Sequence, residues 1–379
     1  MYRRRRNKFD LHQTLVTSVI IVVITGISLL SIWIIRGLSK VDPAVKREEE
    51  KASQSSQAEE QSSYAEGEGD LQESSGIDEN AIDTSRYSIA EFDSNALTRG
   101  DLILVNGEHE YRFDEADEFV TIYGNKNKAY MVKDALVELN QTTLDALNRM
   151  MLDFFTETGR KNVLVISGVR SYETQEEIFS ARVEQMGEEE TAKLTARPGH
   201  SEHHSGYAVD LNLYLQNGTA KLTNEGDYAW IYEHAAEYGF IQRYTDEKSA
   251  LTGISDESWH FRYVGVPHAS IMTERGYCLE EYMQYLEGFQ FGVSHLNTTC
   301  PDGARYEIYY VAASSDGSAT SVPLPSYGEY TVSGNNAGGF IVTVKLSESA
   351  DSQSSDSGSD SEDSAASGGE DSPESSDTN

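Results

Sequence analysis

The sequence is poor in cysteine and in basic side chains. Among its 379 residues there are two cysteines, Cys278 and Cys300, which excludes a disulfide-rich scaffold and a zinc site made of cysteines. Whether these two pair with each other is left open by the sequence. The 30 Lys and Arg residues face 63 Asp and Glu residues, which gives a net charge of −33. Because nucleic-acid binding requires a concentrated basic face, we expect no nucleic-acid partner.

Several catalytic motifs are also absent. The sequence contains neither S-x-x-K followed by K-T-G, nor G-x-S-x-G, nor H-E-x-x-H. Their absence excludes the serine enzymes that use the first two patterns and the zincin proteases that use the third.

One long apolar run lies near the N-terminus, at residues 15–35, and it contains no charged side chain. As a helix this run would span about 30 Å, the thickness of a bilayer core. The denser basic cluster precedes it, in residues 1–14, so we predict a single-pass membrane anchor with a cytoplasmic N-terminus and an extracellular remainder. A cleaved signal peptide is the alternative, but its apolar region would be shorter, and no small-x-small site follows residue 35.

Two segments have the composition of unfolded chain. Residues 36–95 are rich in Ser, Glu and Gln, and residues 348–379 consist mainly of Ser, Asp, Glu and Gly. Such segments cannot bury enough apolar surface to offset the entropy lost on ordering. We therefore predict a disordered acidic linker and a disordered acidic tail.

The chain between these segments has the patterns of folded protein. In residues 96–290, apolar spacing predicts helices at 143–158, 172–185, 228–238 and 278–286, and strands at 102–105, 163–167, 208–213 and 259–264. Because the helices and strands do not alternate regularly, we predict an α+β fold with a mixed or antiparallel sheet and flanking helices. Residues 291–347 show strand patterns separated by turn residues, which predicts a small β module.

Histidine is the informative residue type. His200, His203 and His204 fall within five positions, and Asp210 follows on an expected strand. A second segment places an acid, Glu257, three residues before His260. Two histidines and one carboxylate are a typical ligand set for catalytic zinc, and a further carboxylate can take a proton from water.

Spacing alone leaves two choices open. It does not tell which of the three clustered histidines binds metal, and it does not choose between Glu202 and Glu257 as the base. Each residue also has an ordinary structural role as an alternative, such as a packed core histidine or a residue that caps a turn.

A pair of motifs reduces these alternatives. They are S-x-H-x-x-G-x-A-x-D at residues 201–210 and E-x-W-H at residues 257–260. Together they resemble the double signature of the VanY-type D-alanyl-D-alanine carboxypeptidases, zinc enzymes of bacterial peptidoglycan with a fold related to the lysostaphin and hedgehog folds. The resemblance extends through residues 167–172, 196–199, 239–240 and 261–265 and covers about half of the chain, from residue 95 to residue 288.

The resemblance implies specific roles. It makes His203, Asp210 and His260 the zinc ligands and Glu257 the general base of a D,D-carboxypeptidase that removes the terminal D-Ala from peptidoglycan stem pentapeptides. Glu202 is then only a motif spacer, and His200 and His204 become residues of the pocket or of the surroundings of the ligands.

Three more residues match substrate-binding positions of the family. Arg170 occupies the position of an arginine that binds the terminal carboxylate of the peptide or the developing oxyanion, and a guanidinium suits that task because it donates two parallel hydrogen bonds. Gln175 and Ser201 match other substrate-contacting positions. The sequence departs from the family at Val169, where relatives often have Tyr, and this change affects the shape of the pocket.

Two alternative functions remain. An L,D-carboxypeptidase that acts on tetrapeptide stems would use the same motif residues, because the selectivity lies in the pocket walls. A non-catalytic cell-wall-binding protein would be expected to have lost a ligand or the base, and all four of these residues are present.

Overall fold

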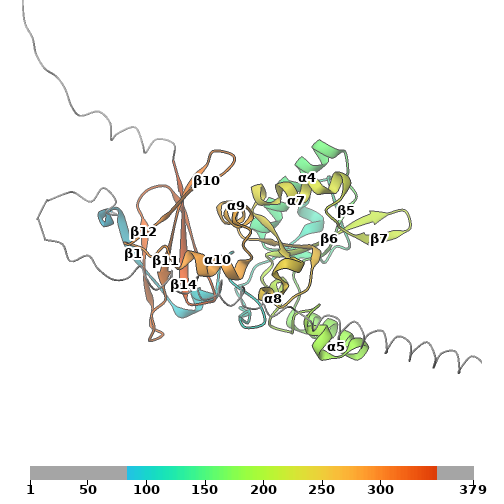
Figure 1. Ribbon diagram of the computed structural model, residues 1–379, viewed down its shortest axis with the longest axis horizontal. Helices are drawn as coiled ribbons and strands as arrows, with labels where there is room; N and C mark the ends of the chain where they lie inside the picture. Colours follow the sequence, from blue (N-terminus) through green and yellow to red (C-terminus); the bar gives the residue numbers. More distant parts are fainter. Residues whose placement is uncertain (1–82, 348–379) are drawn as a thin grey trace, which may run out of the picture. The chain divides into compact units, whose positions relative to one another are not determined.

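The computed structural model describes residues 83–347 (Figure 1). The predicted membrane anchor, most of the predicted linker and the predicted tail lie outside these residues. Within residues 83–347, no helix is both long and apolar enough to cross a bilayer.

A mixed six-stranded sheet forms the centre of the region that was expected to be α+β. Its strand order is β3-β5-β6-β9-β8, and β7 pairs with the C-terminal half of β6, beyond the residues that pair with β9. Only β3 and β5 run parallel, and the other pairs are antiparallel, so the predicted fold class is confirmed for the described residues. The strands are β3 (Met131–Val132), β5 (Val163–Ser167), β6 (Ala208–Leu215), β7 (Gly218–Lys221), β8 (Phe240–Tyr244) and β9 (Glu257–Tyr263).

The two faces of this sheet have different neighbours. Val163, Val165, Val209 and Leu211 point to one face, where they share an apolar core with the helix α4 (Gln141–Thr158). Side chains alternate between the faces of a strand, so the residues between them, including Asp210, point to the other face. That second face carries the polar groups of the candidate site.

The helix α4 shows how local sequence sets the position of this core. Asn140 begins the helix by accepting a hydrogen bond from the amide of Thr142, and Gly159 ends it with a left-handed backbone at φ 69°. Its buried face includes Leu147 and Phe154, both without solvent exposure. Burial of each such side chain contributes about 1.5–3 kcal/mol, so the apolar spacing of the sequence fixes this helix against the sheet.

Short helices and 3-10 turns connect the remaining strands. The segment predicted as one helix at residues 228–238 is instead divided into three short elements that end at Gly239, whose φ is 87°. The other three helices predicted by periodicity are confirmed. The elements are α3 (Ile122–Asn125), α5 (Tyr172–Met186), α6 (Glu188–Ala192), α7 (Ala229–His234), α8 (Ser249–Thr252), α9 (Val266–Arg275), α10 (Leu279–Leu286), and the 3-10 helices η1 (Thr84–Arg86), η2 (Ser94–Thr98), η3 (Glu202–Ser205), η4 (Gly226–Tyr228), η5 (Ala235–Tyr238) and η6 (Asp246–Lys248).

The C-terminal β segment forms an antiparallel four-stranded sheet with the order β10-β11-β14-β13. A fifth strand of this segment, β12, pairs with β1, which comes from the segment predicted to be a disordered linker (Figure 1). The prediction that the linker extends to residue 95 is therefore wrong for β1. The strands are β1 (Tyr87–Phe92), β10 (Leu296–Thr299), β11 (Arg305–Ala312), β12 (Thr320–Pro325), β13 (Glu329–Gly334) and β14 (Gly339–Leu346), and a separate pair consists of β2 (Val120–Thr121) and β4 (Glu138–Leu139).

The predicted strand at residues 102–105 is also wrong, because Leu102 lies in a turn and residues 103–105 belong to no strand. Its amides bond elsewhere: Leu102 N donates to Ser333 Oγ at 3.0 Å, and Leu104 N donates to Asn335 O at 3.0 Å. Its apolar side chains are buried. The segment therefore ties the C-terminal β segment to the remainder of the fold. Cys278 and Cys300 are buried free cysteines.

Candidate metal centre and active site

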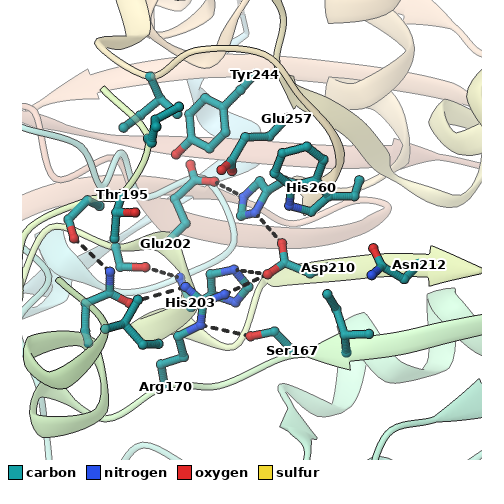
Figure 2. A pocket seen from close by; sticks show the side chains of 18 of the residues that line it. Ser167, Arg170, Thr195, Glu202, His203, Asp210, Asn212, Tyr244, Glu257 and His260 are labelled. Carbon is teal, nitrogen blue, oxygen red and sulfur yellow. Dashed lines mark hydrogen bonds and ion pairs between the residues drawn. The ribbon is translucent and has the colours of Figure 1, made fainter. Parts of the chain in front are cut away.

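Three residues from separate parts of the sequence meet on the polar face of the central sheet. His203 lies in η3, while Asp210 on β6 and His260 on β9 are directly opposite each other in the strand register. One ligand atom from each of the three lies within 4.8 Å of the others, and all three side chains are buried. Figure 2 shows both imidazoles directed at the Asp210 carboxylate. Among residues 83–347, this is the group of His, Cys, Asp and Glu side chains that could hold a metal ion.

Two glycines allow close packing near this cluster. Gly206 ends η3 at φ 72°, and a Cβ there would lie 2.8 Å from both the Asn140 amide nitrogen and the Phe119 ring. At Gly168, a Cβ would lie 2.1 Å from the carbonyl oxygen of Glu138. Neither contact is possible for a larger residue without movement of the chain. The glycines therefore allow the end of η3 and the segment after β5 to pack closely against residues 138–140.

Each imidazole has one nitrogen held by the protein and one directed at Asp210. His203 Nδ1 lies 2.6 Å from the Gly168 carbonyl oxygen, which leaves Nε2 at 3.2 Å from Asp210 Oδ2. His260 Nε2 lies 3.2 Å from Glu202 Oε2, and its Nδ1 lies 2.9 Å from Asp210 Oδ1. Metal-binding histidines are normally oriented in this way, by an acceptor on the nitrogen that does not bind. The donor set of two imidazoles and one carboxylate fits catalytic zinc.

The pKa shifts in this cluster follow from burial and close charges. Burial, with the nearby Arg170 guanidinium, lowers the pKa of His203 to about 4. Burial also acts to lower the pKa of His260, but hydrogen bonds to Asp210 and Glu202 outweigh it and raise that pKa to about 9. Burial acts to raise the pKa of Asp210, yet the histidines and Arg170 hold it well below its usual range. The cluster is thus built around an ionised carboxylate that attracts positive charge.

The interpretation of Glu202 as only a motif spacer is wrong. Its Oε1 accepts hydrogen bonds from Arg243 Nε at 2.7 Å and Arg262 Nη1 at 3.0 Å, and its side chain has no solvent exposure. Although burial acts to raise its pKa, the two guanidiniums lower it below the usual range. Glu202 is therefore an ionised buried group that holds the ring of His260. Its partners Arg243 and Arg262 are distant in the sequence, so local sequence gives no signal for this role.

Glu257 lies at the start of β9, and its register partner on β8 is Tyr244. Figure 2 shows Glu257 next to Tyr244 and His260, with Arg170 on the opposite side of the cluster. Burial raises the pKa of Glu257 to about 7, and the negative charge of Asp210 adds to this effect, against the opposing charges of His260 and Arg170. A carboxyl group whose pKa lies near neutrality is suited to both taking and returning a proton.

Arg170 follows the end of β5 and is held in place by three side chains. Its Nε donates to Ser167 Oγ at 2.9 Å, and its Nη2 donates to Asp210 Oδ2 at 2.6 Å. Its Nη1 donates to Gln175 Oε1 at 3.3 Å, and the amide of Gln175 donates to the Ala196 carbonyl oxygen at 2.7 Å. Gln175 is buried, so in this structure it positions Arg170.

The other sequence-predicted residues lie close by. Ser201 is buried at the start of η3, where its hydroxyl accepts a hydrogen bond from the His203 amide at 3.4 Å. His204 is not directed at Asp210, because its two nitrogens contact Arg170 O and Gly199 N. His200 lies beside a separate small cavity, with Nδ1 2.7 Å from Asn106 O.

One cavity of about 600 Å³ brings these groups together. A volume of this size is typical of sites for small ligands. The sequence-predicted site residues that line it are Arg170, Gln175, Ser201, His203, Asp210, Glu257 and His260.

Comparison with known proteins gives consistent results. The family model of VanY, D-alanyl-D-alanine carboxypeptidase, matches residues 137–266. A D-alanyl-D-alanine carboxypeptidase of Enterococcus faecium is 32% identical over 283 residues, which cover 72% of this chain and 82% of that protein. The vancomycin-resistance D,D-dipeptidase VanXYg, solved with a D-Ala-D-Ala phosphinate analogue, is 31% identical with a TM-score of 0.62, and the match covers 68% of this chain and 99% of that one. A vancomycin-resistance D,D-pentapeptidase VanY variant solved with Zn(II) is 30% identical with a TM-score of 0.41, over 48% of this chain and 98% of that one.

Proposed function

Because this chain belongs to the VanY family of D-alanyl-D-alanine carboxypeptidases, we propose that it removes the terminal D-alanine from the pentapeptide stems of peptidoglycan. The observation that carries this proposal is the meeting of His203, Asp210 and His260 in one cavity with Glu257 and Arg170. These groups correspond to a metal site, a base and a binder of carboxylates. All three are needed by a metal-dependent exopeptidase.

Zinc is the cofactor of this family. We assign its binding to His203 Nε2, the Asp210 carboxylate and His260 Nδ1, the atoms that face one another in the cluster. When bound, zinc acts as a Lewis acid and lowers the pKa of a coordinated water molecule to about 7.

Glu257 is the general base in this proposal. Its carboxylate accepts a proton from the attacking water, whose oxygen bonds to the carbonyl carbon of the last peptide bond. The protonated Glu257 then donates that proton to the leaving nitrogen as the C–N bond breaks. The products are free D-alanine and a stem that is one residue shorter. The pKa of about 7 suits this double task, because the group must be ionised in the first step and a proton donor in the second.

Arg170 binds the terminal carboxylate of the substrate in this proposal. A guanidinium can donate two parallel hydrogen bonds to a carboxylate, which gives preference for the end of a chain over its interior. Ser167 and Gln175 hold the side chain of Arg170 at the cavity wall. Gln175 thus contributes to binding through Arg170, and Ser201 contributes by holding η3.

A second candidate substrate is the free dipeptide D-Ala-D-Ala, because the relative with a TM-score of 0.62 is named a D,D-dipeptidase. The L,D-carboxypeptidase activity predicted as an alternative is the third. We also propose that the apolar segment at residues 15–35 anchors the chain in the cell membrane, with the catalytic part outside the cell. The β module, residues 291–347, is proposed to support the catalytic part.

The test is direct. Purified full-length protein, analysed for bound zinc, is incubated separately with a stem pentapeptide, a stem tetrapeptide and D-Ala-D-Ala, and the products are identified by mass spectrometry. We expect about one zinc per chain and release of D-alanine from the pentapeptide. Cleavage of the tetrapeptide or the dipeptide alone would replace the proposed substrate, and a zinc-loaded protein that cleaves none of the three would refute the proposed activity.

A further inference from the structure

The floor of the active-site cavity contains a second row of residues next to the metal-ligand row. On β6, Asn212 follows Asp210 by two residues and therefore points to the same face of the sheet. Its register partners are Leu164 on β5 and Lys221 on β7, and all three line the cavity. Two residues of a strand span about 7 Å, so this second row lies about that far from Asp210.

The second row lies among cations. Lys221, Lys133 and Arg182 line the cavity in addition to Arg170. Within residues 83–347, none of Lys221, Lys133 and Arg182 forms an ion pair with a carboxylate: Arg182 donates to the Leu194 carbonyl oxygen at 3.0 Å, and Lys221 Nζ lies 3.6 Å from the centre of the Trp259 ring. A cation–π contact positions an ammonium group without a bonded counter-ion, and the charges of Lys221 and Arg182 act at longer range on the carboxyl groups of Asp256 and Glu257. Cations in a cavity wall that lack a directly bonded carboxylate indicate an anionic ligand.

The same wall contains buried polar atoms without partners. Asn212 Oδ1 and Thr195 Oγ1 are both buried and accept or donate no hydrogen bond within the protein, and the whole Thr195 residue is only 8% exposed. Figure 2 shows the Asn212 side chain beside Asp210 in the cavity. Buried polar atoms without a partner are costly, so their presence in a cavity wall indicates polar groups of a ligand.

The strand register shows where the Asn212 row lies relative to the metal ligands and Arg170. Ser167 on β5 is opposite Asp210, Leu164 comes three residues earlier, and Arg170 comes three residues later. The Asn212 row and the backbone of Arg170 therefore lie on opposite sides of the metal-ligand row. If Arg170 holds the end of the substrate, the preceding residues of the substrate extend over Asn212 toward Lys221.

We propose that Lys221, Lys133 and Arg182 form an anion-binding subsite for a second carboxylate of the substrate, on the residue two positions before the scissile bond, while Asn212 Oδ1 accepts a hydrogen bond from a peptide N–H of the same substrate. This inference rests on the proposed function, because it uses Arg170 as the binder of the terminal carboxylate. Two extended peptide residues span about 7 Å, which matches the distance between the two rows. The substrate class is thus a D-Ala-terminated peptide that carries an acidic group near its end.

The experiment uses matched peptides that end in D-Ala-D-Ala. One glutamate is placed at the second, third or fourth residue before the scissile bond, and each peptide has a partner with glutamine at that position. For full-length protein we expect kcat/KM about tenfold higher for glutamate than for glutamine at the second position, because charge-assisted hydrogen bonds are stronger than neutral ones. The preference is expected to disappear in Lys221→Gln and to reverse in Lys221→Glu. Lys161→Gln, which removes an exposed lysine outside the cavity, is the control and should keep it.

Binding separates this inference from the proposed reaction. The dissociation constants of the same peptides are measured with zinc-loaded Glu257→Gln protein, in which cleavage is not needed. A tighter Kd for the glutamate peptide supports the subsite even if no peptide is cleaved, in which case only the proposed reaction fails. Equal Kd values for each pair, or a preference that Lys221→Gln leaves intact, would overturn the subsite.

Discussion

The central sheet and the C-terminal β segment each bury a histidine against a carboxylate, but with opposite results. In the central sheet, His203 and His260 direct one nitrogen each at Asp210, beside an open cavity. In the C-terminal segment, His295 Nδ1 contacts Glu307, whose oxygens also accept hydrogen bonds from Tyr87 and Tyr327. The two clusters use similar residue types.

The difference lies in which groups are free to bind something else. The Glu307 carboxylate is surrounded by donors from the protein, and the His295 ring stacks on Tyr309 with 4.6 Å between ring centres. Around Asp210, the outer nitrogen of each histidine is held by a protein acceptor, and the two inner nitrogens converge on the carboxylate beside the cavity. Burial of a histidine and a carboxylate is therefore no sign of function by itself. The informative feature is the convergence of two imidazole nitrogens and a carboxylate beside a cavity.

The largest expected effect belongs to the base. Glu257→Gln removes the proton acceptor but leaves the three metal ligands in place, so we expect kcat to fall by about 10²–10⁴ while bound zinc is retained. D-alanine release and metal content of the same sample are the two measurements. Glu233→Gln, which changes an exposed glutamate of α7, is the matched control and should behave as wild type. Wild-type turnover in Glu257→Gln would assign the base to another group.

The next test compares the loss of one histidine from each of the two clusters. His203→Ala should lose zinc and activity, because it removes one of three ligands. His295→Ala should keep zinc and activity but lose about 2 kcal/mol of unfolding free energy, since it leaves buried polar groups unpaired and removes a stacked ring. Metal analysis, D-alanine release and urea unfolding give the three readouts. Loss of zinc in His295→Ala, or retention of zinc in His203→Ala, would contradict the assignment of the metal site to the Asp210 cluster.

A smaller effect is expected from the buried carboxylate behind His260. Glu202→Gln keeps the shape of the side chain but removes the charge that faces Arg243, Arg262 and His260. Loss of such an outer partner typically weakens metal binding about 10–100-fold, and we expect zinc affinity to fall within that range in a chelator competition. Glu202→Asp, which restores the charge, should recover part of the affinity. Unchanged zinc affinity in Glu202→Gln would mean that the group serves folding alone.

The smallest effect concerns a histidine between the two regions. His268 on α9 is buried, with its nitrogens 2.8 Å from Tyr282 Oη and Thr343 Oγ1, and burial lowers its pKa to about 3. Because this pKa lies below the unfolded value of about 6.5, its contribution to stability is complete above pH 6.5 and is lost as the pH falls toward 3. Between pH 7 and pH 5, urea unfolding should show wild type losing about 2 kcal/mol more than His268→Gln. Equal losses would assign the acid sensitivity to other groups.

Much of the central sheet and the ligand cluster follow from local sequence. The buried run at residues 163–167 gives β5 with the predicted bounds, and the apolar spacing after Asn140 gives α4. His203, Asp210 and His260 were predicted as one group through a motif, and the structure brings them within 4.8 Å.

The features that sequence reasoning missed depend on pairing between distant segments. Glu202 has its role only because β8 and β9 place Arg243 and Arg262 beside it. The strand β1 contains Tyr87, Ile89 and Phe92, but it follows a long Ser- and Glu-rich stretch, and its partner β12 lies more than 200 residues later. Likewise, the segment at residues 102–105 is apolar enough for a strand, but its amides bond to a side chain and a turn. Local composition contains no information about such partners.

The direct pairing of Asp210 with His260 has a consequence for assembly of the chain. A slip of β9 by one residue would turn His260 to the apolar face, and the three donors would no longer meet. An ion that binds only the aligned sheet stabilises that alignment over every misaligned one by mass action. Zinc binding would therefore favour the correct register of β6 and β9, and retention of the ion would report that these strands are correctly paired.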